Sequence, residues 1–140
     1  MRYLLDTNIF IFLVLDPDSL SRDVRAIFDD YDNTFYMSSE SVKELIVGFN
    51  NGKIVSRYWD DAAKMVKDIT NRYFIRILPV SEEQMDTYVH LELNLAEDNR
   101  DPSYHVIIAH AITNRMPLIS SDSKFWFYKN QGLELIYNEK

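Results

Sequence analysis

The sequence contains no cysteine, and only three of its 140 residues are glycine and four are proline. The absence of cysteine excludes a disulfide scaffold, a thiolate zinc site and a cysteine nucleophile, and it fits a reducing cytoplasm. No run of residues reaches the roughly 18 apolar residues of a membrane span, and the first residues resemble a strand rather than a secretion signal. We therefore expect a cytoplasmic protein without membrane contact.

Positive charge is also scarce, because 15 Lys and Arg residues face 22 Asp and Glu residues and the net charge is −7. Such a chain does not bind phosphate backbones by bulk attraction. If nucleic acid is a substrate, the contact needs a bound metal or a local cationic cluster, such as Lys53, Arg57 and Lys64.

The 46% of hydrophobic residues are distributed so that strands alternate with helices. We expect strands over residues 2–5, 34–37, 73–80, 116–120 and 133–137. We expect helices over residues 19–29, 39–50, 56–72, 81–93 and 102–114, with a polar loop over 94–101. This alternation predicts an α/β protein whose parallel sheet carries helices on both faces. Because no linker or repeat interrupts the pattern, we expect one domain over residues 1–140.

Four acidic residues fall where such a sheet would bring them together. Asp6 follows the first strand, Asp122 follows the fourth, Glu44 lies in the helix after the second, and Asp101 lies beside a helix start. Ligands of parallel sheets bind at the carboxyl ends of the strands. Two carboxylates 4 Å apart repel by roughly 4 kcal/mol at an effective dielectric near 20, so a cluster without metal should raise the pKa of at least one of them. Mg²⁺ or Mn²⁺ would relieve this repulsion and support phosphodiester hydrolysis.

Each acid also has a simpler interpretation. An aspartate at a strand end is often a turn residue or a helix cap, and a glutamate in a helix is often merely solvated.

Four segments carry a family resemblance: LLDTNIF (4–10), SSESVKELIVG (38–48), DPSYHVIIAHA (101–111) and LISSDSKF (118–125). Their order and spacing resemble those of PIN domains, in particular the VapC-type ribonuclease toxins of bacterial toxin–antitoxin pairs. The resemblance extends from residue 2 to about residue 137. It implies a three-layer α/β/α sandwich that cleaves RNA with Mg²⁺ or Mn²⁺, binds a cognate antitoxin and commonly forms a homodimer.

The resemblance also implies roles for individual residues. Asp6, Glu44 and Asp122 match the metal-binding acids of the family, and Asp101 is the nearest match to a fourth catalytic acid. Thr7, Asn8 and Ser120 match polar positions that orient those carboxylates.

Position 104 departs from the family pattern. The motif usually reads Asp-Pro-x-Asp with the second Asp in the metal pocket, but this sequence has Tyr104 there. Asp101 reads as a helix N-cap with Pro102 in the first turn. Either Tyr104 weakens metal binding and places a large ring near the pocket, which we favour, or Asp101 supplies the missing ligand.

Other features carry weaker signals. The three histidines lack the spacing of a zinc pair, and we expect His105 at a cap or on the surface. The aromatic run 125–128 would stack an RNA base or, as we favour, pack a short helix onto the sheet. Apolar helix faces within residues 40–70 would serve as a partner surface or as core.

Two other functions compete with a metal-dependent endoribonuclease. One is a catalytically inactive PIN domain that only binds an antitoxin or RNA. The other is a receiver-like signalling domain, which also places acids at strand ends.

Overall fold

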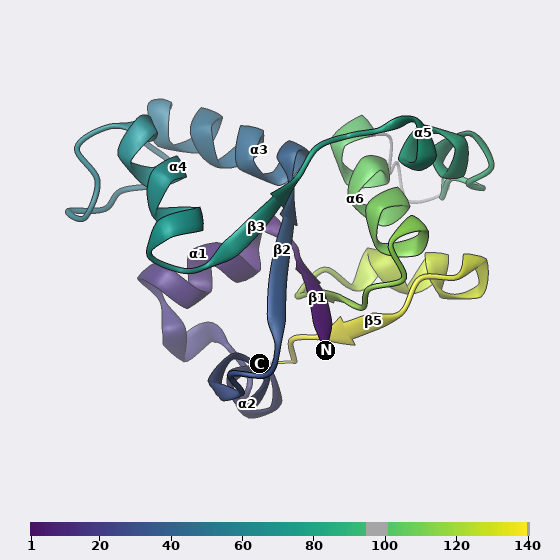
Figure 1. Cartoon of the computed structure of the whole chain (residues 1–140), viewed down its shortest axis with the longest axis horizontal. Helices are drawn as coiled ribbons and strands as arrows, with labels where there is room; N and C mark the ends of the chain where they lie inside the picture. The colour runs from purple at the N-terminus through teal and green to yellow at the C-terminus, as the bar shows by residue number, and fades with distance from the viewer. Residues whose placement is uncertain (95–100, 140) are drawn as a thin grey trace.

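A five-stranded sheet forms the centre of the computed structural model, which describes residues 1–94 and 101–139 (Figure 1). The strands are β1 (Arg2–Leu5), β2 (Thr34–Ser38), β3 (Ile75–Leu78), β4 (Leu118–Ser120) and β5 (Leu135–Tyr137). Their order is β3-β2-β1-β4-β5, and all four pairs of neighbours are parallel. A receiver domain has the order 2-1-3-4-5, so that interpretation is wrong.

Alternate side chains of each strand enter two different hydrophobic cores, as expected for a sheet covered on both faces. In β1, Leu5 belongs to the first core and Leu4 to the second. Their partners in β4, Ile119 and Leu118, divide in the same way.

Helices from the first half of the chain cover one face and later helices cover the other, which confirms the three-layer sandwich (Figure 1). The first group is α1 (Thr7–Leu15), the 3₁₀ helix η1 (Pro17–Ser19), α2 (Arg22–Asp29), α3 (Ser39–Asn50) and α4 (Ala62–Asn71). The second group is α5 (Glu82–Val89), α6 (Pro102–Thr113) and the 3₁₀ helix η3 (Ser123–Gln131). In the described part of the chain, no helix is long and apolar enough to cross a membrane.

Side chains at the predicted helix starts do cap these helices. Ser21 caps α2, Ser38 caps α3 and Asp101 caps α6 through side-chain oxygens that accept backbone N–H groups. Ser81 and Gln84 form the capping box of α5.

Several element boundaries differ from those expected. The helix predicted from residue 56 begins at Ala62, because Asp61 accepts a hydrogen bond from the Lys64 N–H at 2.8 Å. The strand predicted over 73–80 begins only after Phe74, whose φ of 56° is left-handed and incompatible with a strand. Helix α5 ends at Val89 rather than at 93, and most of the polar loop predicted over 94–101 lies outside the described residues.

We expect Asp61→Ala to lower the free energy of unfolding by about 1 kcal/mol, because α4 loses its N-cap. Ser56→Ala should change it by less than about 0.5 kcal/mol, because the Ser56 hydroxyl accepts only an exposed N–H from Tyr58. Urea unfolding of the two variants measures both values. A larger loss of unfolding free energy for Ser56→Ala than for Asp61→Ala would indicate that the helix begins at residue 56.

Candidate active site

Asp6 lies where β1 ends beside β4, and three hydrogen bonds fix it. Its N–H donates to the Ile119 carbonyl at 3.0 Å, which extends the pairing of the two strands. Its Oδ2 accepts from the Ser120 hydroxyl at 2.7 Å, and its Oδ1 accepts from the Thr7 N–H at 2.9 Å. The carboxylate of Asp6 is therefore oriented from both β4 and α1.

The Thr7 side chain connects Asp6 to Glu44. Its hydroxyl donates to Glu44 Oε2 at 3.3 Å, and Glu44 projects from the second turn of α3. Thr7 thus contacts two of the predicted acids at once. Asn8, the third polar position implied by the resemblance, is exposed, and no hydrogen bond within residues 1–94 and 101–139 joins it to an acid.

Ser120 connects Asp6 to Asp122 in the same manner. The Asp122 N–H donates to the Ser120 hydroxyl oxygen at 3.0 Å, while that hydroxyl donates its own proton to Asp6. Asp122 Oδ1 accepts from the Lys124 N–H at 2.9 Å and caps η3. Three of the predicted acids are therefore connected in one chain, Glu44–Thr7–Asp6–Ser120–Asp122.

Asp101 lies on the Glu44 side of this chain. Its Oδ1 accepts from the Ser103 N–H at 2.9 Å, which confirms the predicted N-cap. Asp101 and Glu44 line one pocket of about 330 Å³, together with Lys43 and Lys53.

The acids influence one another electrostatically. Burial raises the pKa of the Asp6 carboxyl, hydrogen bonds from Ser120 and Thr7 oppose that rise, and the charge of Asp122 adds to it. Burial also raises the pKa of Glu44, and the charges of Asp6 and Asp101 raise it further. The sequence predicted this direction from repulsion alone, but burial is the largest cause at both residues.

These residues suit a hard divalent cation in their chemistry. Their side-chain donors are carboxylate and hydroxyl oxygens, which Mg²⁺ and Mn²⁺ prefer. Among the described residues, no ion pair neutralises Asp6, Glu44 or Asp122. In the described part of the chain, no three acids or histidines lie close enough together to hold a metal ion without rearrangement. The arrangement is thus an open set of acids that hydrogen bonds through Thr7 and Ser120 connect.

Tyr104 is partly buried against the second core, and it is not among the residues that line the pocket of Glu44 and Asp101. The ring stacks on Phe125 with centroids 4.1 Å apart and planes 10° apart, and the hydroxyl oxygen is buried. His105, expected at a cap or on the surface, is also buried and meets the Tyr104 ring edge-on. The predicted packing of a short aromatic helix is confirmed by Phe125 and Tyr128, which are fully buried in η3.

The predicted cationic cluster is divided among different environments. Lys64 pairs with Asp68 at 2.9 Å, and the Arg57 guanidinium lies 5.8 Å from the centre of the Tyr58 ring. Of the three residues in the predicted cluster, Lys53 alone lines the pocket of Glu44 and Asp101.

Glu40 is a residue that sequence reasoning missed. It accepts a hydrogen bond from the Ser103 hydroxyl at 3.1 Å and pairs with Lys43 at 2.5 Å, and these contacts lower the pKa of its carboxyl. Glu40 thereby joins the start of α3 to the start of α6 and holds Lys43 at the wall of the pocket. The spacing of Glu40, Lys43 and Glu44 on one helix face was the available signal.

Comparison with known proteins gives a family match and structural matches. The PIN domain family model matches residues 3–131. VapBC2 from Rickettsia felis, solved with a promoter DNA fragment, matches with a TM-score of 0.72 and 22% identity over 99% of this chain and 100% of the other. VapBC-1 from nontypeable Haemophilus influenzae matches with a TM-score of 0.72 and 22% identity over the full length of both chains.

A member of the VapBC family of toxin–antitoxin systems, VapBC-5 from Mycobacterium tuberculosis, matches with a TM-score of 0.63. Its identity is 20%, over 97% of this chain and 98% of the other. At these identities the structural matches establish a shared fold. No curated protein matches the sequence.

We expect Glu44→Gln to raise the free energy of unfolding at pH 7. A raised pKa means that the folded chain binds the proton more tightly than the unfolded chain, so ionisation of Glu44 opposes folding above its folded pKa. The gain should disappear as the pH falls below about 4, where free glutamates are protonated. Thermal unfolding from pH 3 to 7 measures it.

The exposed Glu134→Gln is the control, because it removes one negative charge outside the acidic pocket. An equal gain in both variants would mean that net charge, rather than the acidic site, destabilises the fold.

Proposed function

This chain belongs to the PIN domain family, and we propose that it is a VapC-type toxin that hydrolyses RNA phosphodiester bonds with Mg²⁺ or Mn²⁺. The observation that carries the proposal is the chain of hydrogen bonds through Thr7 and Ser120 that joins Glu44, Asp6 and Asp122 at the junction of β1 and β4. In this sheet order β1 and β4 are neighbours from which the chain proceeds to opposite sides, and ligands bind at such a switch point.

Asp6, Glu44 and Asp122 would hold the metal, and Asp101 would complete the catalytic set from the Glu44 side. A bound divalent metal supplies a hydroxide nucleophile at neutral pH and stabilises the leaving oxygen. The chain's own part is to orient the acids. Ser120 and Thr7 donate hydrogen bonds to Asp6, so its carboxylate keeps one orientation while it is partly buried.

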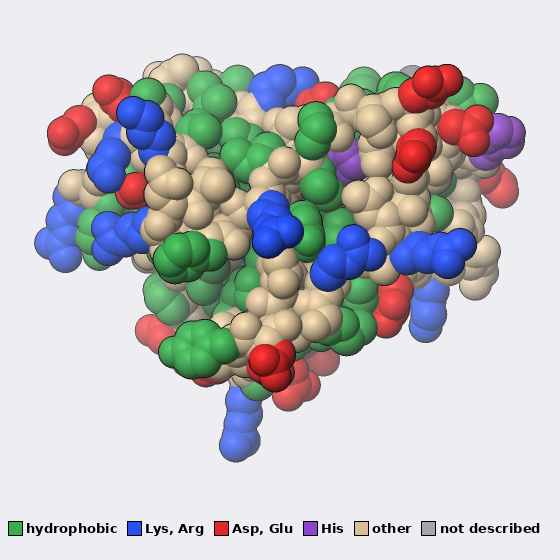
Figure 2. Space-filling model, viewed as in Figure 1, with side chains coloured by type: hydrophobic (Ala, Val, Ile, Leu, Met, Phe, Trp, Pro, Cys, Tyr) green, Lys and Arg blue, Asp and Glu red, His purple; other side chains and the backbone are tan. Residues whose placement is uncertain are grey.

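Lys and Arg side chains are spread over the visible face rather than gathered in one patch (Figure 2). An RNA substrate would therefore need positive charge close to the site itself. The pocket beside Glu44 provides such charge. Lys43 and Lys53 line it with Asp101, and the ion pair with Glu40 holds Lys43 in place. This arrangement supports RNA whose phosphates lie between the acids and the two lysines.

The structural matches to VapBC complexes support a cognate antitoxin as the partner. A toxin that cuts cellular RNA requires such an inhibitor, and we propose that this chain binds one. A homodimer and a cytoplasmic location belong to the same proposal.

We further propose that Tyr104 leaves the site with weaker metal binding than the family motif would give. A tyrosine contributes no carboxylate at position 104, and its ring packs against the second core. Asp101 retains its capping bond to Ser103 and lies in the pocket with Glu44, which supports some residual activity.

A second candidate function is an inactive PIN domain that acts only by binding an antitoxin or RNA. It is favoured by the aromatic residue at position 104 and by the lack of a preassembled group of three metal ligands among the described residues. The two candidates differ in whether divalent metal binds at the acids.

The function is tested by thermal unfolding and RNA cleavage with and without Mn²⁺. At a Mn²⁺ concentration about 100 times Kd, binding should stabilise the protein by about 2.7 kcal/mol, which is several degrees in Tm. Single-stranded RNA should be cut only with metal. Asp122→Asn should lose both effects, whereas Glu134→Gln should retain both. Cleavage that persists in Asp122→Asn or in the presence of a chelator would contradict the metal mechanism.

The role of position 104 is tested by Tyr104→Asp with Tyr104→Asn as its matched control. Both should be destabilised by on the order of 3 kcal/mol, because each removes the ring that stacks on Phe125. Only Tyr104→Asp adds a carboxylate, so only it should bind Mn²⁺ more tightly than the wild type, by at least tenfold. If the wild type binds Mn²⁺ and cuts RNA as well as Tyr104→Asp does, the proposal that Tyr104 weakens the site is wrong.

A further inference from the structure

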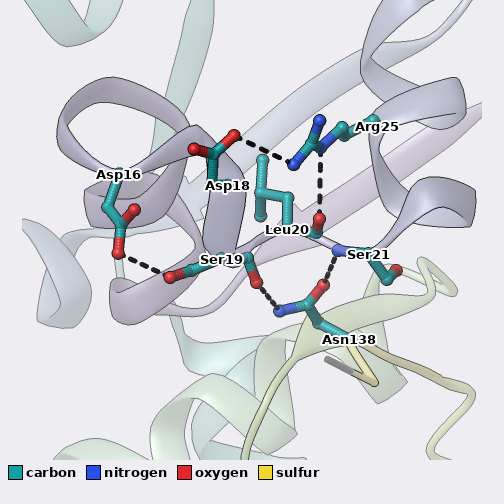
Figure 3. A network of polar contacts seen from close by, with 7 residues as sticks. All are labelled: Asp16, Asp18, Ser19, Leu20, Ser21, Arg25 and Asn138. Atoms are coloured by element: carbon teal, nitrogen blue, oxygen red, sulfur yellow. Dashed lines mark hydrogen bonds and ion pairs between the residues drawn. The ribbon is translucent and has the colours of Figure 1, made fainter.

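Asn138 is a polar residue near the end of the chain that is only 4% exposed. Its side-chain amide makes three hydrogen bonds, and Figure 3 shows the two that join it to Ser19 and Ser21. Oδ1 accepts from the Ser21 N–H at 2.6 Å, while Nδ2 donates to the Ser19 carbonyl at 2.9 Å and to the Ser121 hydroxyl at 2.8 Å. One side chain therefore joins the segment before α2 to the segment after β4.

The backbone of Asn138 also bonds to the end of β4. Its N–H donates to the Ser120 carbonyl at 2.7 Å, which continues the pairing of β5 with β4 beyond Tyr137. Asn138 thus holds the carbonyl of Ser120 and the hydroxyl of Ser121, the two residues that precede Asp122.

The segment to which Asn138 is tied is itself held by several contacts (Figure 3). The Ser19 hydroxyl donates to Asp16 at 2.5 Å, and Arg25 Nε donates to the Leu20 carbonyl at 3.1 Å. Arg25 also pairs with Asp18 at 3.5 Å. These contacts hold residues 19–21 in place. Through its own hydrogen bonds, Asn138 ties the end of β4 to this fixed segment.

We infer that Asn138 is a positioning residue for the acidic site. It fixes Ser120 and Ser121, and Ser120 in turn orients the Asp6 carboxylate and the Asp122 N–H. If the Asn138 side chain is lost, Ser121 is no longer tied to the segment before α2, and the carboxylates of Asp6 and Asp122 lose their fixed separation. The metal-binding consequence rests on the proposed function, whereas the local geometry does not.

The chemistry of the position favours asparagine. The three partners require one acceptor and two donors on a short planar group, and an asparagine amide supplies this set. Aspartate is isosteric, but when ionised it offers acceptors only and would place a buried charge against the Ser19 carbonyl. Alanine removes the three side-chain bonds but keeps the backbone bond to Ser120.

The test compares Asn138→Ala and Ser121→Ala with the wild type. Ser121→Ala is the milder variant, because it breaks only the bond toward the acidic site and leaves the bonds of Asn138 to Ser19 and Ser21. Gln84→Ala is the matched control. Gln84 is also a buried amide that joins two segments, but it bonds Asn114 at the far end of α6 from Asp101.

The first readout is the Kd of Mn²⁺, measured by titration calorimetry. Asn138→Ala should raise Kd by about tenfold, the usual cost of losing a residue that orients metal ligands. Ser121→Ala should raise it in the same direction by a smaller factor, and Gln84→Ala should leave it unchanged while lowering Tm. Unchanged Mn²⁺ affinity in Asn138→Ala and Ser121→Ala would overturn the inference.

The second readout needs no metal. The amide of Asp122 is protected by Ser120, so its hydrogen exchange should accelerate in Asn138→Ala relative to the Leu4 amide, which bonds the Pro117 carbonyl within the sheet. Gln84→Ala should not change this ratio. If the wild type binds no Mn²⁺, the proposed function fails, and the exchange ratio alone decides the positioning role. An unchanged ratio in Asn138→Ala would overturn it.

Discussion

A single hydroxyl group, that of Ser120, joins the Asp6 carboxylate to the backbone of Asp122 at the point where β1 and β4 meet. It donates to the Asp6 carboxylate and accepts from the Asp122 N–H, so it fixes both acids relative to one strand. This contact depends on the pairing of β1 with β4, which are separated by more than a hundred residues in sequence. The sheet order, the hydrogen bonds of Asn138 and the orientation of the acids therefore depend on one another.

The acids serve as helix caps and as members of the site at the same time. Asp6, Asp101 and Asp122 each accept a backbone N–H through Oδ1 at the start of a helix. The positive end of a helix stabilises a nearby negative charge, which offsets part of the repulsion among the carboxylates. The simple interpretation of each acid as a cap and its interpretation as a site residue are thus compatible, because capping uses one oxygen and sets the direction of the other.

The aromatic residue at position 104 shows how the fold can absorb a departure from a motif. A tyrosine at the start of α6 lies beside Phe125 and Tyr128 of η3, and stacking there leaves the residue partly buried. The absence of an acid at this position is accompanied by an aromatic contact with the second core.

Local patterns determined most of the elements and the edge of the sheet where the acids gather. The strand ends at Asp6 and Asp122 and the caps at Ser21, Ser38 and Asp101 follow from hydrophobic periodicity and capping chemistry, which act over a few residues. The burial of His105, the stacking of Tyr104 on Phe125 and the bonds of Asn138 were decided only by tertiary structure. These features depend on contacts between distant segments, and no local pattern specifies which segments will meet.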